Sequence, residues 1–368
     1  MSGPTGTRQE PSGKGLRVCL LLRYFTVGGL ERVVTSLANE LVERGVDVRV
    51  VALAVAKRNA LMTELDPRVE AITLSGPPLR RLAAVARLTR GRVVHLHFGD
   101  GRIHPLVRLA LRGRRTVVSY HSDYTHKRSR LRNRIDRYVN RRTDQILAVS
   151  QAVRDFCTSQ IGLEQERVEV VPNAIRVDCP KRADKGEHGG LVVISLAGLY
   201  PHKNQATVLE GVAEARRRGV DVQLRVIGDG PQMAQLYQQS VALGIAEAVE
   251  WYGQVWRRDL VLPLLTTSQV FVSASRFEGM PISILEAMAA GLPLVLSDIS
   301  SHRETAGEAG LYFAPDKPGE LAAALEGLAA DAHRRKELGE TSLERSGLFD
   351  LDRFTDRHLQ VYRRVSGR

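Results

Sequence analysis

Two glutamates with seven residues between them are the first pair in this sequence whose types and spacing could do chemistry. Glu278 and Glu286 enclose Gly279 and Pro281, which suit an irregular turn, and the letters ISILEAMAAG that follow predict the start of a helix. The free N–H groups of a helix N-terminus can hold phosphate oxygens or sugar hydroxyls. A carboxylate one turn into that helix can accept two hydrogen bonds from a diol such as ribose. The alternative is structural, because an acid near a helix N-terminus is itself stabilising by ~0.3–1 kcal/mol.

A lysine and a glycine-rich turn each follow a predicted strand in the same half of the chain. Lys203, in SLAGLYPHKNQATVL, could bind a diphosphate or could be a solvated loop lysine. Gly228, Asp229 and Gly230, in IGDGP, make a good turn after a strand. No G-x-G-x-x-G dinucleotide motif accompanies them, so this turn alone indicates little.

The first half of the chain contributes a glycine pair and a histidine. Gly28 and Gly29 follow a strand and open a helix, so their N–H groups could approach a phosphate, and a tight strand-to-helix turn is the alternative. His121 stands at the end of a predicted strand in VVSYHSDY. His95 and His97 suggest a metal pair, but because side chains alternate along a strand we expect them to point to opposite faces. We therefore expect no essential metal ion.

The segment FEGMPISILEAMAAGLPLV resembles the donor-binding signature of retaining glycosyltransferases of family 4, which have the GT-B fold. The match extends well beyond the two glutamates, and most of the chain resembles the family. The resemblance implies that Glu286 binds the nucleotide ribose and that Lys203 binds the diphosphate. Gly198 stands where the family often has an arginine, which leaves Lys203 alone or assisted by His202 or Arg176.

The resemblance implies a site to which both halves of the chain contribute. His121, Lys203 and Glu278 would lie beside the reacting groups. The donor would be held by Gly28, Gly29, Gly198, Lys203, Asn204, Gly228, Asp229, Gly230, Val255, Gly279, Met280, Pro281, Ile282 and Glu286. The implied reaction moves a sugar, with retention, from a UDP- or GDP-sugar to a hydroxyl of a lipid-linked or soluble glycan. It would serve the synthesis of cell-surface polysaccharide, glycolipid or another glycoconjugate, without a cofactor.

Three other functions are compatible with these residues. A nucleotide-sugar epimerase or hydrolase would use the same donor site and would need no acceptor. A basic nucleic-acid-binding protein would fit the net charge of +12. A scaffold that has kept the fold and lost activity would fit the glycine at position 198.

The elements that must position these residues alternate between apolar runs and amphipathic segments. In the first half we expect strands at 17–24, 46–53, 69–74, 93–98, 115–121, 145–150 and 168–173. In the second half we expect strands at 191–199, 222–230, 248–254, 269–275, 293–298 and 310–315. Many of these runs are Val/Ile/Leu-rich on both faces, as parallel strands covered by helices require. This pattern predicts an α/β fold of two Rossmann-like, doubly wound domains whose ligand lies at the carboxyl ends of the strands.

The domain boundaries follow from breaks in this alternation. Residues 1–15 are rich in Gly, Ser, Pro and Thr, lack the apolar core of a signal peptide and predict a disordered tail. A polar stretch at 177–190 separates an N-terminal acceptor domain at 16–175 from a C-terminal donor domain at 176–350. The last helix, within 351–368, has no strand after it, so we expect it to pack back on the first domain.

Composition and charge indicate the compartment of the protein and the kind of partner that it meets. The 368 residues are 43% hydrophobic and 26% charged, and no apolar run is long enough to span a bilayer. The three scattered cysteines, Cys19, Cys157 and Cys179, favour a reducing cytoplasm. Residues 1–175 hold 30 basic and 16 acidic side chains, against 23 and 25 in residues 176–368. The first half should therefore meet an anionic partner.

The arginine-rich stretch 125–144 is the best candidate for that contact. Leu131, Ile135, Tyr138 and Val139 recur at helical spacing, which predicts an amphipathic helix with an arginine-rich outer face. The helix is either simply solvated or docks through 125–142 on an anionic membrane, such as the inner face of the plasma membrane, at about 1 kcal/mol per basic residue. Nucleic acid is not expected, because stacking aromatic residues do not interleave with the arginines.

Overall fold

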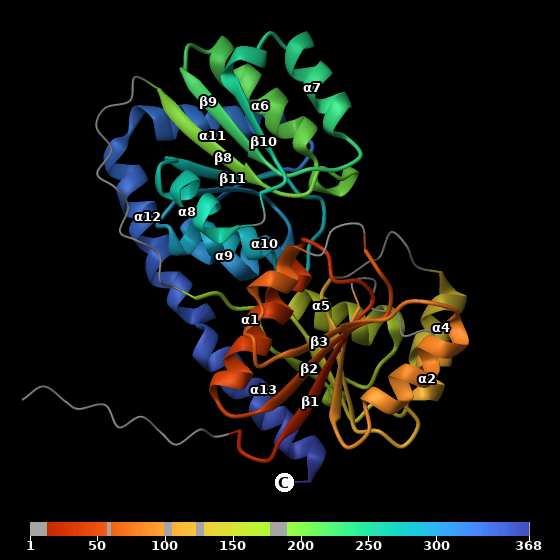
Figure 1. Ribbon diagram of the computed structural model, residues 1–368. Helices are drawn as coiled ribbons and strands as arrows, with labels where there is room; N and C mark the ends of the chain where they lie inside the picture. Colours follow the sequence, from red (N-terminus) through yellow and green to blue (C-terminus); the bar gives the residue numbers. More distant parts are fainter. Residues whose placement is uncertain are drawn as a thin grey trace, which may run out of the picture. The chain divides into compact units, whose positions relative to one another are not determined.

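The computed structural model describes residues 13–56, 60–98, 105–122, 129–176, 190–255 and 257–367 (Figure 1). The chain divides into two compact units. The first comprises Met1–Ala148, Phe156–Val171 and Leu351–Arg368, and the second comprises Val149–Asp155 and Pro172–Asp350. Residues 1–12 of the tail expected at 1–15, and most of the polar stretch at 177–190, lie outside the described residues.

The first unit is built on a seven-stranded sheet in the order β3-β2-β1-β4-β5-β6-β7, and all of its pairs are parallel. The strands are β1 (Arg17–Leu22), β2 (Asp47–Ala52), β3 (Glu70–Thr73), β4 (Val93–His97), β5 (Thr116–Tyr120), β6 (Gln145–Ala148) and β7 (Val168–Val170). The VCLLL run of β1 is fully buried, because helices cover both faces of the sheet.

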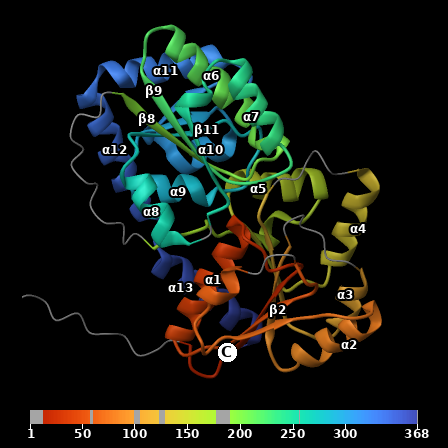
Figure 2. The same cartoon turned by 45° about the horizontal axis from the view of Figure 1, so that its top comes forward.

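The helices of the first unit form a layer on each face of this sheet. Figures 1 and 2 show α1 (Gly29–Glu43) and α13 (Leu351–Ser366) on one face, with α2 (Pro78–Leu88) and α4 (Arg130–Asn140) on the other. The remaining helices of this half of the chain are α3 (Pro105–Ala110) and α5 (Gln151–Phe156). Right-handed crossovers explain this division, because the strand order runs outward from β1 in one direction and from β4 in the other.

The last helix of the chain is fixed on the first unit by apolar and charged contacts. Leu359, Val361 and Tyr362 of α13 are buried. Arg44, which follows α1, pairs with Asp352 at 2.6 Å and with Asp356. These contacts bring the end of the chain onto its first helix.

The second unit is built on a six-stranded parallel sheet in the order β10-β9-β8-β11-β12-β13. Its strands are β8 (Leu191–Leu196), β9 (Val222–Ile227), β10 (Val249–Gly253), β11 (Val270–Ser273), β12 (Leu294–Ser297) and β13 (Gly310–Phe313). Its helices are α6 (Gln205–Arg217), α7 (Met233–Ala242), α8 (Arg258–Thr266), α9 (Ile282–Ala289), α10 (Ser300–Ala306), α11 (Pro318–Ala330) and α12 (Ala332–Ser346). The strand order reverses beside β8, so the loops after β8 and β11 meet at one carboxyl edge. The predicted fold of two doubly wound parallel sheets is confirmed.

Two helical glycines of the second unit differ in what surrounds them. Gly211 on α6 packs so closely on α11 that an added Cβ would lie 2.5 Å from the buried side chain of Leu321. Gly327 on α11 has open space around its Cα. The first glycine permits helix contact, whereas the second only lowers helix propensity.

We predict that Gly211→Ala lowers the free energy of unfolding by ~1–3 kcal/mol through overpacking. Gly327→Ala, the matched control, should raise it by ~0.5–1 kcal/mol, because alanine loses less backbone entropy than glycine in a helix. Urea denaturation of both variants measures the two changes. A stabilised Gly211→Ala variant would show that α6 and α11 do not pack as closely as described.

Candidate donor-binding and catalytic residues

The centre of the candidate site in the second unit is an ion pair between Lys203 and Glu278. Lys203 ends a short 3₁₀ turn, Pro201–Lys203, after β8, and Glu278 follows β11. The Ser275 hydroxyl donates a hydrogen bond of 2.8 Å to Oε1 of Glu278. Burial alone would raise the pKa of Glu278, but the charge and hydrogen bond of Lys203, with His302 and Ser275, bring it below its usual value. The carboxylate is therefore ionised near neutral pH.

The predicted turn after Glu278 leads directly into α9. Pro281 is the N-cap of α9, and Gly279, Met280 and Ile282 are buried around it. The N-terminus of α9 therefore begins four residues after Glu278, and its free N–H groups belong to the same segment of chain. Glu286 is the fifth residue of α9 and is 7% exposed.

Asn173 fixes this turn and was not anticipated from the sequence. Its Nδ2 donates to the carbonyl of Met280 at 3.0 Å, and its backbone N–H donates to the Met280 sulfur at 3.2 Å. Asn173 is 4% exposed. It follows the last strand of the first sheet in the letters VPNAI, and only its position after a strand could have drawn attention to it.

Ser297 and His302 support the same site from the next strand and helix. The Ser297 hydroxyl donates to the carbonyl of Ser275 at 2.5 Å. Nδ1 of His302 lies 3.0 Å from the Ser297 carbonyl oxygen, and burial lowers the pKa of His302 to about 4. A neutral imidazole thus lies behind the Lys203–Glu278 pair. Neither residue belongs to a motif or a spacing that predicts a site.

The predicted glycines after β8 and β9 bring two loops into backbone contact. A Cβ on Gly228, whose φ is +151°, would lie 1.8 Å from the Ala197 carbonyl oxygen. A Cβ on Gly230 would lie 2.6 Å from the Leu199 carbonyl oxygen, and the Leu199 N–H donates to the backbone carbonyl of Asp229 at 3.0 Å. The IGDGP motif therefore tolerates no side chains at its two glycines.

Gly198, at the position of the family arginine, lies against an aromatic ring. A Cβ there would meet the Tyr200 ring at 3.0 Å. The Tyr200 ring stacks with the His202 ring, which stacks with Phe277 at a centroid distance of 4.8 Å. The ring of Tyr200 thus occupies the space into which a side chain at position 198 would extend.

Asn204 and Val255 complete the predicted donor residues of the second unit. Asn204 has a left-handed φ of 54° and caps α6. Its Nδ2 donates to the Pro315 carbonyl at 2.8 Å, and its Oδ1 accepts from Arg276 at 3.2 Å. Val255 is half-buried after β10, and in the part of the chain that the structure describes no hydrogen bond joins it to the Lys203–Glu278 pair.

In the first unit, Gly28 is the N-cap of α1 and Gly29 is its first residue. The carboxylate of Glu31 lies beside Gly28, within 2.7 Å of where a Cβ would stand, and accepts a hydrogen bond of 2.8 Å from Thr26. Burial raises the pKa of Glu31 above its usual value. An acid whose pKa is raised by burial therefore lies at the helix N-terminus that was expected to approach a phosphate.

His121, which is partly buried after β5, forms a row with three buried histidines, His95 and His97 on β4 and His358 on α13. Its Nε2 lies 3.1 Å from Nδ1 of His97, and the ring centroids of His97 and His95 are 3.8 Å apart. The expectation that His95 and His97 point to opposite faces is wrong, because residues two apart on a strand share a face. Across the described ranges, no group of three or more His, Cys, Asp or Glu has a geometry that could hold a metal ion.

The helix predicted within 125–144 forms at Arg130–Asn140, but its orientation differs from the expectation. Leu131, Ile135 and Tyr138 are 67%, 43% and 72% exposed, and only Val139 of the apolar set is buried. The buried residues of α4 are Asp136, Val139 and Asn140, so its buried side is largely polar. The Asn140 side chain donates to the Tyr120 hydroxyl at 3.0 Å. The arginines and the apolar stripe therefore share the exposed side, and residues 125–128 lie outside the described part.

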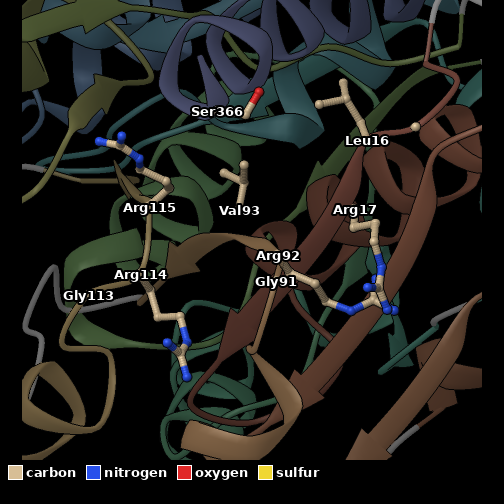
Figure 3. Close-up of a pocket in the computed structure, with 10 residues that line it drawn as sticks. Leu16, Arg17, Gly91, Arg92, Val93, Gly113, Arg114, Arg115 and Ser366 are labelled. Atoms are coloured by element: carbon tan, nitrogen blue, oxygen red, sulfur yellow. The ribbon is translucent and has the colours of Figure 1, made fainter. Parts of the chain in front are cut away.

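A surface cavity lies at the opposite, amino-terminal ends of β1, β4 and β5 (Figure 3). It has a volume of about 250 Å³ and is lined in part by Arg17, Arg92, Arg114 and Arg115. Arg17 and Arg92 both bind Asp47, at 3.1 and 2.8 Å, and Figure 3 shows Arg114 and Arg115 directed away from one another. The guanidinium groups do not converge on one ligand, and no predicted site residue lines this cavity.

Comparison with known sequences identifies the family. Residues 190–331 match the family described as Glycosyl transferases group 1, and residues 27–178 match the one described as Glycosyltransferase Family 4. The D-rhamnosyltransferase WbpZ of Pseudomonas aeruginosa is 27% identical over 338 residues, which are 85% of this chain and 86% of WbpZ. EpsF of Bacillus subtilis is 29% identical over 162 residues, so that match spans 41% of each chain.

Solved structures share the fold of the chain. Anabaena HepE in complex with UDP and glucose superposes with a TM-score of 0.81 at 19% identity, over 94% of this chain and 99% of HepE. WaaG, a glycosyltransferase involved in lipopolysaccharide biosynthesis, gives a TM-score of 0.73 at 17% identity, over 94% of this chain and 99% of WaaG. The two doubly wound parallel sheets, together with these matches, show a glycosyltransferase of the GT-B class. The chain belongs to glycosyltransferase family 4.

The histidine row makes the stability of the protein depend on pH. Burial lowers the pKa of His121 and of His358 to about 4, and lowers those of His95 and His97 well below their usual value. Between the folded values and the unfolded value of about 6.5, the unfolded chain binds more protons on these groups. The stability that they contribute is complete above that unfolded value and is lost as the pH falls toward about 4.

We predict that acidification from pH 7.5 to 5.5 lowers the free energy of unfolding, by at most ~1.4 kcal/mol per pH unit for each buried histidine. His358→Gln should reduce this slope, because one proton fewer is taken up on unfolding. His333→Gln is the control, since the His333 side chain is 82% exposed. Urea denaturation at a series of pH values measures the slopes, and equal slopes for wild type and His358→Gln would contradict the prediction.

Proposed function

We propose that this protein transfers a sugar from a UDP- or GDP-sugar to an acceptor hydroxyl, with retention at the anomeric carbon. The observation that carries the proposal is the Lys203–Glu278 pair at the carboxyl edge of the second sheet, four residues from the N-terminus of α9. The structural relative HepE was solved with UDP and glucose, and WbpZ is a D-rhamnosyltransferase, which supports a nucleotide-sugar donor.

The proposal assigns a role to each charged group. Lys203 and the N–H groups at the start of α9 stabilise the negative charge of the departing diphosphate. Glu286 accepts hydrogen bonds from the ribose, while Glu278 and His121 face the transferred sugar. The leaving phosphate takes the proton of the acceptor hydroxyl on the same face. Because protein groups carry the charge, the reaction as proposed needs neither a metal ion nor a cofactor.

Donor binding must change the partner of Lys203 from Glu278 to the diphosphate. In the structure this lysine neutralises Glu278, and the two side chains are only 20% and 12% exposed. A diphosphate that enters takes over part of the lysine charge, and Glu278 then turns to sugar hydroxyls as donors. The ion pair thus keeps both groups satisfied in the unliganded protein, since an unpaired buried charge is strongly destabilising.

We predict that Lys203→Ala lowers kcat by ~10²–10³-fold with the preferred donor, the range seen when one charge-stabilising group is removed. The variant should also lose ~3–5 kcal/mol of stability, because Glu278 is left buried without its partner. Lys203→Ala combined with Glu278→Gln should recover the stability and remain inactive. Lys317→Ala, at a lysine 67% exposed, is the control that keeps activity. Turnover of a UDP- and GDP-sugar panel measures activity, and an active Lys203→Ala enzyme would remove Lys203 from the proposal.

The same assay separates the transferase from its alternatives. An epimerase or hydrolase would convert the donor rapidly without an acceptor. A nucleic-acid-binding protein would show salt-sensitive DNA or RNA binding that UDP and GDP do not change. A donor at 100 times its dissociation constant stabilises the fold by ~2.7 kcal/mol, so thermal shifts identify the nucleotide independently of turnover. Binding without turnover across the whole panel would indicate an inactive scaffold.

We further propose that the acceptor is presented at an anionic membrane and that α4 contacts it. Leu131, Ile135 and Tyr138 are spaced i, i+4 and i+7, so they form one exposed apolar stripe. Exposed arginines on α4, among them Arg134 and Arg137, accompany the stripe. A stripe of this kind with basic residues beside it suits the interface of an anionic bilayer. Within the described ranges, no helix combines the length and apolarity needed to cross a bilayer.

The cysteines support a cytoplasmic setting for this activity. Cys19 and Cys157 are buried free thiols, and burial raises the pKa of Cys19 to about 12. Such thiols are unreactive and persist in a reducing compartment. Cys179 lies outside the described residues. We therefore propose that the protein works in the cytoplasm, on the inner face of the plasma membrane.

We predict that the triple variant Leu131→Gln, Ile135→Gln and Tyr138→Gln binds vesicles of phosphatidylcholine with phosphatidylglycerol at least tenfold more weakly than wild type. Loss of buried apolar area at the interface is the physical reason. Leu348→Gln, at an exposed leucine of the second unit, is the matched control. Flotation or sedimentation with vesicles measures binding, and equal binding of the triple variant and wild type would show that α4 is merely solvated.

A further inference from the structure

The row of histidines in the first unit is more than a set of core residues. Nδ1 of His95 lies 2.6 Å from the Tyr362 hydroxyl on α13, and its Nε2 lies 2.8 Å from the Ser119 hydroxyl. His97 lies between His95 and His121, with ring centroids 3.8 and 5.3 Å away. His95 and His97 are 0% and 1% exposed. The row therefore connects α13 to His121 through two buried imidazoles.

His97 uses its two ring nitrogens unequally. Its Nδ1 lies 3.1 Å from Nε2 of His121, whereas its Nε2 is buried and has no hydrogen-bond partner within the described residues. Nδ1 of His121 is likewise without a partner there, and His121 is only partly buried, at the carboxyl end of β5. Among the described residues, His121 is thus held by a hydrogen bond through Nε2 alone.

A hydrogen bond between two neutral imidazoles contains one proton and has two arrangements. If His121 donated, the N–H on Nε2 of His97 would be buried without an acceptor. If His97 donates, the buried Nε2 has only an unused lone pair. Orphaned buried N–H groups are rarer in folded proteins than under-used acceptors, so the second arrangement is favoured. Burial lowers the pKa of both residues, which keeps both rings neutral.

We propose that His97 is a positioning residue whose Nδ1–H donates to Nε2 of His121, so that His121 carries its own proton on Nδ1. His121 then presents an N–H donor to an oxygen atom of the bound substrate. The role assigned to the substrate rests on the proposed glycosyl transfer, whereas the tautomer of His121 does not. The stacking of His95 on His97, and the bond of His95 to Tyr362, hold the donor ring in place.

The first test reads the tautomer directly. Long-range ¹H–¹⁵N NMR of histidine-labelled protein at pH 7.5 distinguishes Nδ1–H from Nε2–H on His121, whose signals the His121→Gln variant assigns. We expect Nδ1–H in the wild type and in His97→Asn, because the asparagine amide can donate from the position of Nδ1. In His97→Leu the donor is absent, and we expect the Nε2–H form to become populated. An Nε2–H tautomer in wild type would overturn the proposal whatever the activity.

The second test reads catalysis in the same variants. We expect kcat/KM to fall about tenfold in His97→Leu, the factor that corresponds to ~1.4 kcal/mol, and to stay within threefold of wild type in His97→Asn. Equal losses in both variants would indicate a packing role and overturn the positioning role. His333→Leu, at the exposed histidine, controls for histidine removal. If the wild-type protein showed the Nδ1–H tautomer but no glycosyltransferase activity, the proposed function would be wrong and the tautomer assignment would still hold.

Discussion

The largely buried carboxylate of Glu278 determines the arrangement of the loops around it in the second unit. A charge at this depth needs compensation, and Lys203 and Ser275 supply it from two neighbouring loops. Those loops can meet only because the parallel strands β8 and β11 are adjacent and end at the same edge. The same strand order that lets Lys203 neutralise Glu278 therefore also places a cation at the edge of the sheet where we propose that the diphosphate binds.

Backbone contact is the second constraint on this edge of the sheet. Gly228 and Gly230 let the loop after β9 touch the carbonyls of Ala197 and Leu199, which fixes the path of the chain toward Lys203. On the other side, the Asn173 amide holds the Met280 carbonyl before α9 begins. The loops of the candidate site are thus fixed by close approach and by buried hydrogen bonds, which suits a site that must be preorganised for charge development.

The fold could be predicted from sequence because each strand of a parallel sheet is buried on both faces and reads as an apolar run. The donor-binding motif around Glu278 could likewise be recognised from the sequence. The orientation of α4 was not, because helical spacing groups Leu131, Ile135 and Tyr138 on one face without saying which face meets the sheet. Asn173 was not predicted because its contact with Met280 spans 107 residues of sequence. The error on His95 and His97 came from misapplying the two-residue period of a strand.

The C-terminal helix shows how polar groups can specify a packing arrangement. Most buried residues of α13 are apolar and would tolerate several registers against the sheet, but His358 and Tyr362 share one face, and Tyr362 bonds His95. A one-residue shift rotates a helix by about 100°, which would separate the Tyr362 hydroxyl from His95 and leave both groups unsatisfied in a low-dielectric core. The pairing of Arg44 with Asp352 and Asp356 selects the same register from the surface. The end of the chain is thereby tied to the histidine row, so a helix remote in sequence sets the environment of His121.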